Sequence, residues 1–244
     1  METKTATHPT KRDKYGVYIE LANNVVEDWI ARKYIPTIKE FAPYTSRDIK
    51  NMLSVIAFRS IYVKNISWAI ITCEIIQDFV YVCRKLGVTT LVDAGCGHGV
   101  LAHALREKGL AVDAINADKD KYHEIYRSWG NVIRGDAVKF IEENVNKFDG
   151  VILSWPPYDE SFATEVVNVM RTGQLLFYCG EGRGGCTGDK YFHGALDDWY
   201  DWGDDKVEPP PITFAFLKEE SERINKHFLQ FLNIHDRWRV YIKK

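Results

Sequence analysis

Cysteine is scarce in this sequence, and its few residues show no recognisable spacing. Five cysteines occur in 244 residues, and none of them form a Cys-x-x-Cys pair or a zinc-ligand pattern. An odd number without such spacing argues against both a disulfide scaffold and a structural zinc site. We therefore expect free thiols, a reducing and cytoplasmic location, and no metal ion.

A long uncharged apolar run is also missing. The most apolar stretch, 66–86, contains Glu74, Asp78 and two basic residues, whereas a membrane-spanning helix needs about 20 nearly uncharged residues. The first 14 residues are polar and basic without an apolar core, unlike a secretory signal. We expect no membrane association, and a buried helix over 66–86.

Neither sign of charge dominates the chain. Lys and Arg total 32, Asp and Glu total 34, and the formal net charge is −2. Such a balance gives no overall attraction to nucleic acid, although a local basic face remains possible. Hydrophobic residues make up 45% of the sequence and charged residues 27%, which indicates a globular protein rather than a disordered one.

Three segments differ in their sequence pattern. Residues 1–15 are polar and are expected to form a flexible tail. Residues 16–87 show helical periodicity, and we interpret them as a helical N-terminal extension that packs against a face or edge of the main domain. Residues 88–244 are expected to form that main domain, so the chain is long enough for one domain with extra helices.

Strand and helix patterns alternate from residue 88 onward. Strands are expected over 88–93, 111–116, 132–134, 148–154 and 174–179. Helices are expected over 100–108, 119–128, 137–145 and 162–171. This repetition predicts an α/β fold with a parallel sheet and helices on both faces. The last part differs: it predicts a strand over 212–217, a helix over 218–232 and an alternating strand over 237–242.

The most informative stretch is Leu91-Val92-Asp93-Ala94-Gly95-Cys96-Gly97-His98-Gly99. An apolar run is followed by an acid and then by three glycines at alternate positions. Such a run ends a buried strand and turns sharply into a helix, and glycine is required where the backbone takes a positive φ or a ligand approaches closely. The pattern predicts a nucleotide-like cofactor site at the carboxyl edge of the sheet.

The same stretch resembles the cofactor motif of class I S-adenosylmethionine (SAM) dependent methyltransferases, acid-x-Gly-x-Gly-x-Gly. It differs from the dinucleotide fingerprint Gly-x-Gly-x-x-Gly. The resemblance implies a Rossmann-like, seven-stranded, mostly parallel sheet with an antiparallel last strand. It also implies S-adenosyl-L-methionine as the cofactor, with Asp93, Gly95, Gly97 and Gly99 around its methionine part. In this family, N-terminal additions often also shape the substrate entrance.

Other cofactor contacts follow from the same resemblance. The family places an acid that holds the ribose at the end of the second strand, where this sequence has Asn116. Because an amide has only one carbonyl oxygen to accept with, Asp118 is the alternative ribose ligand. After the third strand, Asp136 is expected near the adenine, with Ala137 beside it, and it also fits a helix N-cap. Ser154, at the end of the fourth strand, completes the predicted set.

The fourth strand ends in Ser154-Trp155-Pro156-Pro157-Tyr158. Two prolines directly after a strand fix a rigid turn. The run resembles the Asp/Asn/Ser-Pro-Pro-Tyr motif of amino-methylating enzymes, which implies catalytic roles for Trp155, Pro156 and Tyr158. Trp155 stands where an amine-accepting side chain is expected, and its indole only donates. It is therefore predicted to stack on a substrate or to face the cationic methyl donor.

Two further sites follow the fifth strand. Residues 180–189 contain five glycines, and Glu181 in this loop is predicted to act as a base or to orient an amine. His235 and Asp236 precede the last strand. A turn or capping role is favoured for them, and a polar pair near the site is the alternative.

The predicted function is methyl transfer from SAM to an acceptor, with a small molecule or a protein side chain favoured. One alternative is an adenine amino-methyltransferase that acts on nucleic acid. A second is a regulatory protein that binds SAM without turnover, and a third is another use of SAM, such as its cleavage. The sequence leaves the oligomeric state open.

Overall fold

A computed structural model of the chain describes residues 11–45, 47–117, 129–200 and 213–244. Four predicted features lie wholly or partly outside these residues: the tail over 1–15, the helix over 119–128, Asp118, and the first residue of the strand over 212–217. Helix α1 (Lys11–Arg32) begins inside the segment predicted as a tail. Among the described residues, no helix is both long and apolar enough to cross a membrane.

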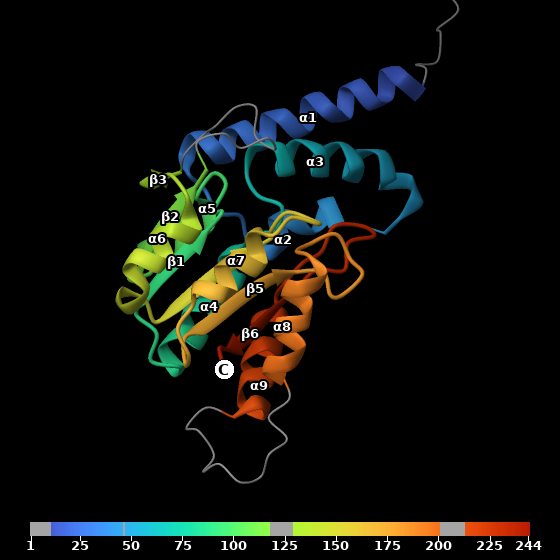
Figure 1. The fold of residues 1–244 in the computed structure, drawn as a ribbon. Helices are drawn as coiled ribbons and strands as arrows, with labels where there is room; N and C mark the ends of the chain where they lie inside the picture. The colour runs from blue at the N-terminus through green and yellow to red at the C-terminus, as the bar shows by residue number, and fades with distance from the viewer. Residues whose placement is uncertain (1–10, 46, 118–128, 201–212) are drawn as a thin grey trace, which may run out of the picture.

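One sheet forms the centre of the molecule, with the strand order β3-β2-β1-β4-β5-β6 (Figure 1). The strands are β1 Thr90–Ala94, β2 Ala111–Asn116, β3 Val132–Arg134, β4 Gly150–Ser154, β5 Leu175–Gly180 and β6 Arg237–Ile242. Neighbouring strands are parallel except for β5 and β6, which are antiparallel. The predicted α/β class, the mostly parallel sheet and the antiparallel last strand are confirmed.

The prediction of seven strands is wrong for the described part of the chain, which holds six. Residues 214–217, predicted as a strand, begin helix α9 (Phe214–Asn225). Thr213 caps this helix, because its hydroxyl accepts a hydrogen bond from the backbone N–H of Phe216 (3.2 Å). Leu217 and Ile224, seven residues apart, are both buried. This spacing is two helical turns, so the apolar residues follow a helical period rather than an alternating one.

Each face of the sheet has its own hydrophobic core, because successive side chains in a strand point to opposite faces. In β1, Leu91 belongs to one core and Val92 to the other. The first core is covered by α4 (Cys73–Lys85), α5 (Val100–Glu107) and α9, and the second by α6 (Ala137–Asn144), α7 (Phe162–Val169) and α8 (Lys190–Tyr200). The result is a three-layer structure in which these six helices pack on the two faces of the sheet (Figure 1).

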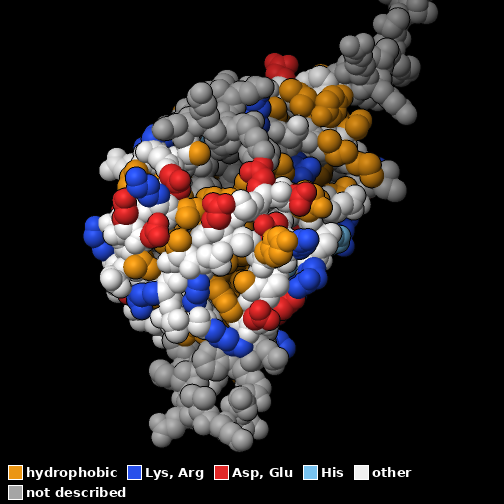
Figure 2. Space-filling view, viewed as in Figure 1, with side chains coloured by type: hydrophobic (Ala, Val, Ile, Leu, Met, Phe, Trp, Pro, Cys, Tyr) orange, Lys and Arg blue, Asp and Glu red, His pale blue; other side chains and the backbone are white. Residues whose placement is uncertain are grey.

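The N-terminal helices form an arm beside this domain. Helix α1 packs along α3 (Met52–Asn65), with the short α2 (Ile38–Phe41) between the arm and the sheet (Figure 1). Aromatic rings join arm and domain, and Phe41 contacts both Tyr62 (centroids 5.1 Å apart) and Phe231 (5.9 Å). The outer side of the arm exposes apolar side chains, which gather together in Figure 2.

The helix predicted over 66–86 begins later than expected. Helix α4 starts at Cys73, and the Thr72 hydroxyl accepts a hydrogen bond from the backbone N–H of Ile75 (3.4 Å) as its N-cap. Residues 66–72 are therefore not helical. This segment leads from α3 to α4 and brings Trp68 to the cavity described below.

Candidate functional site

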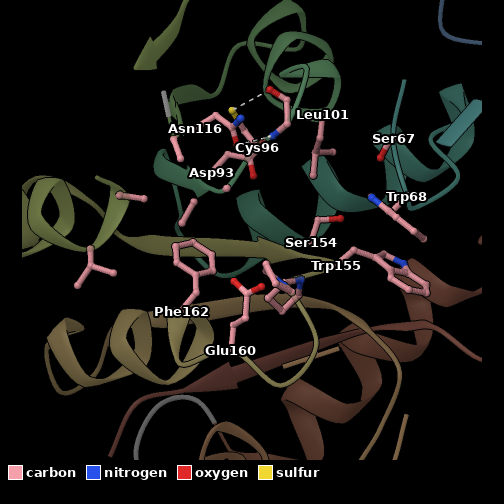
Figure 3. Close-up of a pocket in the computed structure, with 18 of the residues that line it drawn as sticks. Ser67, Trp68, Asp93, Cys96, Leu101, Asn116, Ser154, Trp155, Glu160 and Phe162 are labelled. Atoms are coloured by element: carbon pink, nitrogen blue, oxygen red, sulfur yellow. Dashed lines mark hydrogen bonds between the residues drawn. The ribbon is translucent and has the colours of Figure 1, made fainter. Parts of the chain in front are cut away.

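A cavity of about 570 Å³ lies at the carboxyl ends of β1, β2 and β4 (Figure 3). This is the edge at which parallel α/β sheets bind their ligands, and the volume lies within the usual range for small-molecule sites. Its walls include the turn after β1, the end of β2, the start of α6 and the Pro-Pro turn after β4. The segment with Ser67 and Trp68 closes one side.

The glycine motif forms the turn between β1 and α5. Gly95, Gly97 and Gly99 have φ angles of 71°, 54° and 75°, in the left-handed region that side chains other than glycine adopt only at a cost. Gly95 and Gly97 line the cavity. Gly99 does not; a Cβ atom there would come within 2.7 Å of the Val132 side chain. Gly99 is therefore required for packing, whereas Gly95 and Gly97 allow a ligand to approach the backbone.

Asp93 is the most unusual group of the cavity wall. Its side chain is buried, with 2% of the residue exposed, and its Oδ1 atom has no hydrogen-bond partner among the described residues. Burial raises the pKa of this carboxyl to about 7, although Arg106 acts in the opposite direction. Asp93 belongs to the cavity lining, and a buried carboxyl oxygen without a described partner next to a cavity is suited to a hydrogen-bond donor or a cation supplied by a ligand.

The residues predicted near ribose and adenine also lie on this wall. Asn116 is buried, and its Oδ1 accepts a hydrogen bond from the backbone N–H of Gly97 (3.2 Å), so it also fixes the glycine turn. Asp136 caps α6 through Oδ1, which accepts from the N–H groups of Val138 (2.9 Å) and Lys139 (3.1 Å). Asn116, Asp136 and Ala137 all line the cavity. Asp118 lies outside the described residues.

Trp155 has a strained backbone conformation, and several contacts hold it in place. Its φ is 55°, which is rare for a bulky residue and is tolerated only where the surroundings fix it. Its backbone N–H donates to the carbonyl of Cys179 (2.7 Å), and its indole Nε1–H donates to Oδ2 of Asp236 (2.8 Å). The ring also stacks on Trp68, with centroids 5.3 Å apart and planes 22° apart. Ser154, Trp155 and Trp68 all line the cavity (Figure 3).

Asp236 is the hydrogen-bond acceptor for the indole N–H of Trp155. The residue is 2% exposed, and its Oδ1 has no partner among the described residues. Burial raises the pKa of Asp236 to about 6, although the hydrogen bond from Trp155 acts in the opposite direction. The sequence favoured a turn or capping role for this residue. In the structure it is hydrogen-bonded to the Trp155 indole and is not among the residues that line the cavity.

The Pro-Pro turn contributes its prolines but not its tyrosine. Pro156 and Pro157 line the cavity, and the Pro156 carbonyl accepts from the backbone N–H of Gly188 (3.3 Å). Tyr158 is 62% exposed and is absent from the described lining residues. The structure therefore does not bring Tyr158 to the cavity, and its catalytic role stays a prediction.

Glu181 also lies outside the cavity lining. Its Oε2 accepts from the backbone N–H of Cys186 (2.7 Å) and its Oε1 from that of His235 (3.1 Å). Burial alone raises the pKa of Glu181, but these hydrogen bonds outweigh it, and the pKa is lowered. The Glu181 carboxylate, predicted to act as a base or to orient an amine, holds the glycine-rich loop against the residues that precede β6.

All charged side chains among the described residues of the cavity wall are acidic. Four carboxylates line it, from Asp93, Asp136, Glu160 and Glu165, whereas none of the described lining residues is Lys, Arg or His. Four residues of the lining were not predicted from the sequence as site residues: Glu160, Glu165, Phe162 and Trp68. Glu160 and Phe162 follow the Pro-Pro-Tyr run closely, so that motif was the available signal. Nothing comparable marked Trp68, because its segment was predicted to be helical.

Comparisons with known proteins gave structural likeness only. No family model matches the sequence, and no curated protein matches it. The similar solved structures include a SAM-dependent methyltransferase from Archaeoglobus fulgidus, with 14% identity over 68% of this chain and 94% of that chain and a TM-score of 0.38. An O-methyltransferase from Bacillus cereus in complex with SAH has 12% identity, coverages of 89% and 100%, and a TM-score of 0.40.

A third similar structure is the 1,6-didemethyltoxoflavin-N1-methyltransferase from Burkholderia thailandensis, with 11% identity over 70% of this chain and 79% of that chain and a TM-score of 0.38. Identities this low, with TM-scores below 0.5, assign neither an activity nor a substrate to this chain. The function proposed next therefore rests on the cavity itself.

Proposed function

We propose that this protein transfers a methyl group from SAM to a small-molecule acceptor. The observation that carries the proposal is the buried, unpartnered oxygen of Asp93 beside the left-handed turn at Gly95 and Gly97. SAM carries a sulfonium, an ammonium and a carboxylate group, so it is a cation overall. A cavity with four carboxylates and no basic side chain among its described lining residues fits such a ligand electrostatically.

The residues present fit the parts of SAM as follows. Asp93 would receive the ammonium group of the methionine part, and the backbone of Gly95 and Gly97 would lie against it. Asn116 would lie against the ribose. Asp136 would lie against the adenine, and its helix cap uses Oδ1, so a ligand would be bound by Oδ2. Ala137, next to it, is a buried residue of the same wall.

When bound, SAM supplies an electrophilic methyl group on a positively charged sulfur. The contribution of the protein is positioning, since an in-line displacement requires the acceptor atom to lie behind the methyl carbon. The Pro-Pro turn and the doubly anchored Trp155 provide a rigid wall for this purpose. No side chain of the proposed site needs to act as a nucleophile.

A small acceptor is favoured over nucleic acid. Glu160 and Glu165 line the cavity and would repel a phosphate backbone. On the face drawn in Figure 2, Lys and Arg side chains are interspersed with Asp and Glu rather than gathered in a basic patch. Trp155 donates its indole N–H to Asp236, so it cannot replace the amine-accepting side chain of the adenine amino-methyltransferase motif.

The proposal is tested in two steps. Calorimetry with SAM should show binding, and incubation with methyl-labelled SAM and a cell extract should label the small-molecule fraction. Label in the nucleic-acid fraction would contradict the acceptor class. Binding without label in any fraction would instead support a regulatory SAM-binding protein, and absence of SAM binding would overturn the proposal.

A further inference from the structure

We propose that the methyl acceptor is a small amine, recognised as a cation by Glu160 and the stacked pair Trp68 and Trp155, and methylated on nitrogen. This inference rests on the proposed function and names the acceptor class of that same cavity. In Figure 3, Trp155 and Glu160 lie on the side of the cavity opposite Cys96 and Asn116. The cofactor contacts proposed above use the other side, which leaves this part for the acceptor.

The aromatic pair is built to keep its geometry. Trp155 is anchored at its backbone by Cys179 and at its indole by Asp236, and Trp68 stacks on it. Both rings are only partly buried, and both line the cavity. Indole is the best cation–π partner among the aromatic side chains. Because the indole N–H donates to a carboxylate, the ring is polarised toward greater electron density, which strengthens its attraction for a cation.

The sign of the described wall favours a bound ammonium over a bound oxyanion. An oxygen acceptor reacts best as an oxyanion, and the carboxylates at this wall oppose its formation. The bound ammonium first loses one proton to water; the neutral amine then gives its lone pair to the methyl carbon, the carbon–sulfur bond breaks, and that bonding pair stays on sulfur. The positive charge passes from sulfur to nitrogen, and the nitrogen then releases one proton to water. The acidic wall opposes the first loss of a proton, but it favours both the bound ammonium and the cationic transition state of methyl transfer.

The test uses probes of one shape and different charge. Benzylamine and benzyltrimethylammonium are cations, benzyl alcohol is neutral and benzoate is an anion. Each is titrated into the full chain saturated with SAH, and binding is followed by ligand-observed NMR. We expect both cations to bind about tenfold more tightly than benzyl alcohol and benzoate to bind least, since tenfold is the effect of one well-placed charged contact.

Variants assign the binding to the proposed residues. Glu160→Gln should weaken benzylamine about 3- to 10-fold and leave benzyl alcohol unchanged. Trp68→Ala should weaken it roughly 2- to 30-fold, which spans the usual strength of cation–π contacts. Trp68→Phe, which keeps a ring, should fall between. Glu143→Gln is the matched control, because Glu143 is exposed on α6 and lies outside the cavity lining.

Two outcomes separate this inference from the proposed function. If SAM binds by calorimetry but benzoate binds as well as benzylamine, or if neither cation binds, the amine assignment is overturned and the cofactor site stands. The assignment is also overturned if benzylamine binds equally to the wild type and to Glu160→Gln. If SAM itself fails to bind, the proposed function fails first, and that result is read from a separate titration.

Discussion

The side-chain amide of Asn225 pairs with the backbone of Trp238 much as a neighbouring strand would. Its Nδ2 donates to the Trp238 carbonyl (2.7 Å), and its Oδ1 accepts from the Trp238 N–H (2.9 Å). One turn earlier in α9, the Ser221 hydroxyl accepts from the Val240 N–H (2.9 Å). Side chains of α9 thus supply hydrogen-bond partners for the outer backbone groups of β6, where the sequence predicted another strand.

We predict that Asn225→Ala destabilises the protein by about 1–3 kcal/mol, because it leaves a backbone donor and acceptor of β6 without their partner. Chemical denaturation should show this as a lower midpoint with an unchanged slope. Glu222→Ala on the same helix is the control. Glu222 forms an exposed ion pair with Arg237, and such pairs contribute less than about 1 kcal/mol. Equal effects of the two substitutions would contradict the strand-like role of Asn225.

Gly97 is the test position for the cofactor site. We predict that Gly97→Val abolishes SAM binding, because the branched side chain would enter the cavity at a backbone position with φ of 54°. Gly109→Val is the matched control for backbone strain, since Gly109 also has a positive φ (87°) and a Cβ there meets nothing within 4 Å. Calorimetry should show binding lost in the first variant and kept in the second. Unchanged binding in Gly97→Val would contradict the cofactor assignment.

Asp93 makes stability and ligand binding depend on pH. Burial raises its native pKa from 3.8 to about 7. Between these values the native carboxyl keeps its proton while the unfolded one has lost it, so stability falls as pH rises from about 4 to about 7. We predict that Asp93→Asn removes this fall and is more stable at pH 8 by an amount on the order of a few kcal/mol. Thermal unfolding of both proteins across this range measures the difference.

The same substitution should act in the opposite sense on SAM. A cation favours the ionised carboxyl, so the wild-type affinity should increase between pH 6 and pH 8. Asp93→Asn should bind SAM more weakly at pH 8 and lose most of this pH dependence. A variant that is both less stable and equally good at binding SAM would contradict the role assigned to Asp93.

Much of the fold was predictable because its signals are local. The ends of β2, β3 and β6 were predicted correctly from apolar runs and turn residues, and the Gly95–Gly97–Gly99 spacing located the turn after β1. The strand predicted over 212–217 failed because an apolar run of that length suits either a strand or a helix. The Thr213 cap decides between them.

The site was predictable only where one motif carries it. Asp93 lies near the end of β1, Gly97 in the turn after it and Asp136 after β3, and the structure brings all three to one cavity. Trp68 comes from the N-terminal extension and reaches Trp155 only through the tertiary fold. Tyr158 was inferred from the motif that its run resembles, and Glu181 from its place in the glycine-rich loop after the fifth strand. Neither signal reveals whether a side chain points into a cavity or is held by backbone N–H groups.

Asp236 should position Trp155 rather than contact any ligand. We predict that Asp236→Ala frees the Trp155 indole N–H and weakens benzylamine binding about as much as Trp68→Ala does, with SAM affinity unchanged. Asp236→Asn should restore both properties, because an amide oxygen can accept the same hydrogen bond. The readout is the indole N–H resonance of Trp155, assigned by its loss in Trp155→Phe. This resonance should shift strongly in Asp236→Ala and little in Asp236→Asn. If it is the same in the wild type and the alanine variant, Asp236 does not hold the ring, and the orientation of Trp155 depends on Trp68 and the strained backbone instead.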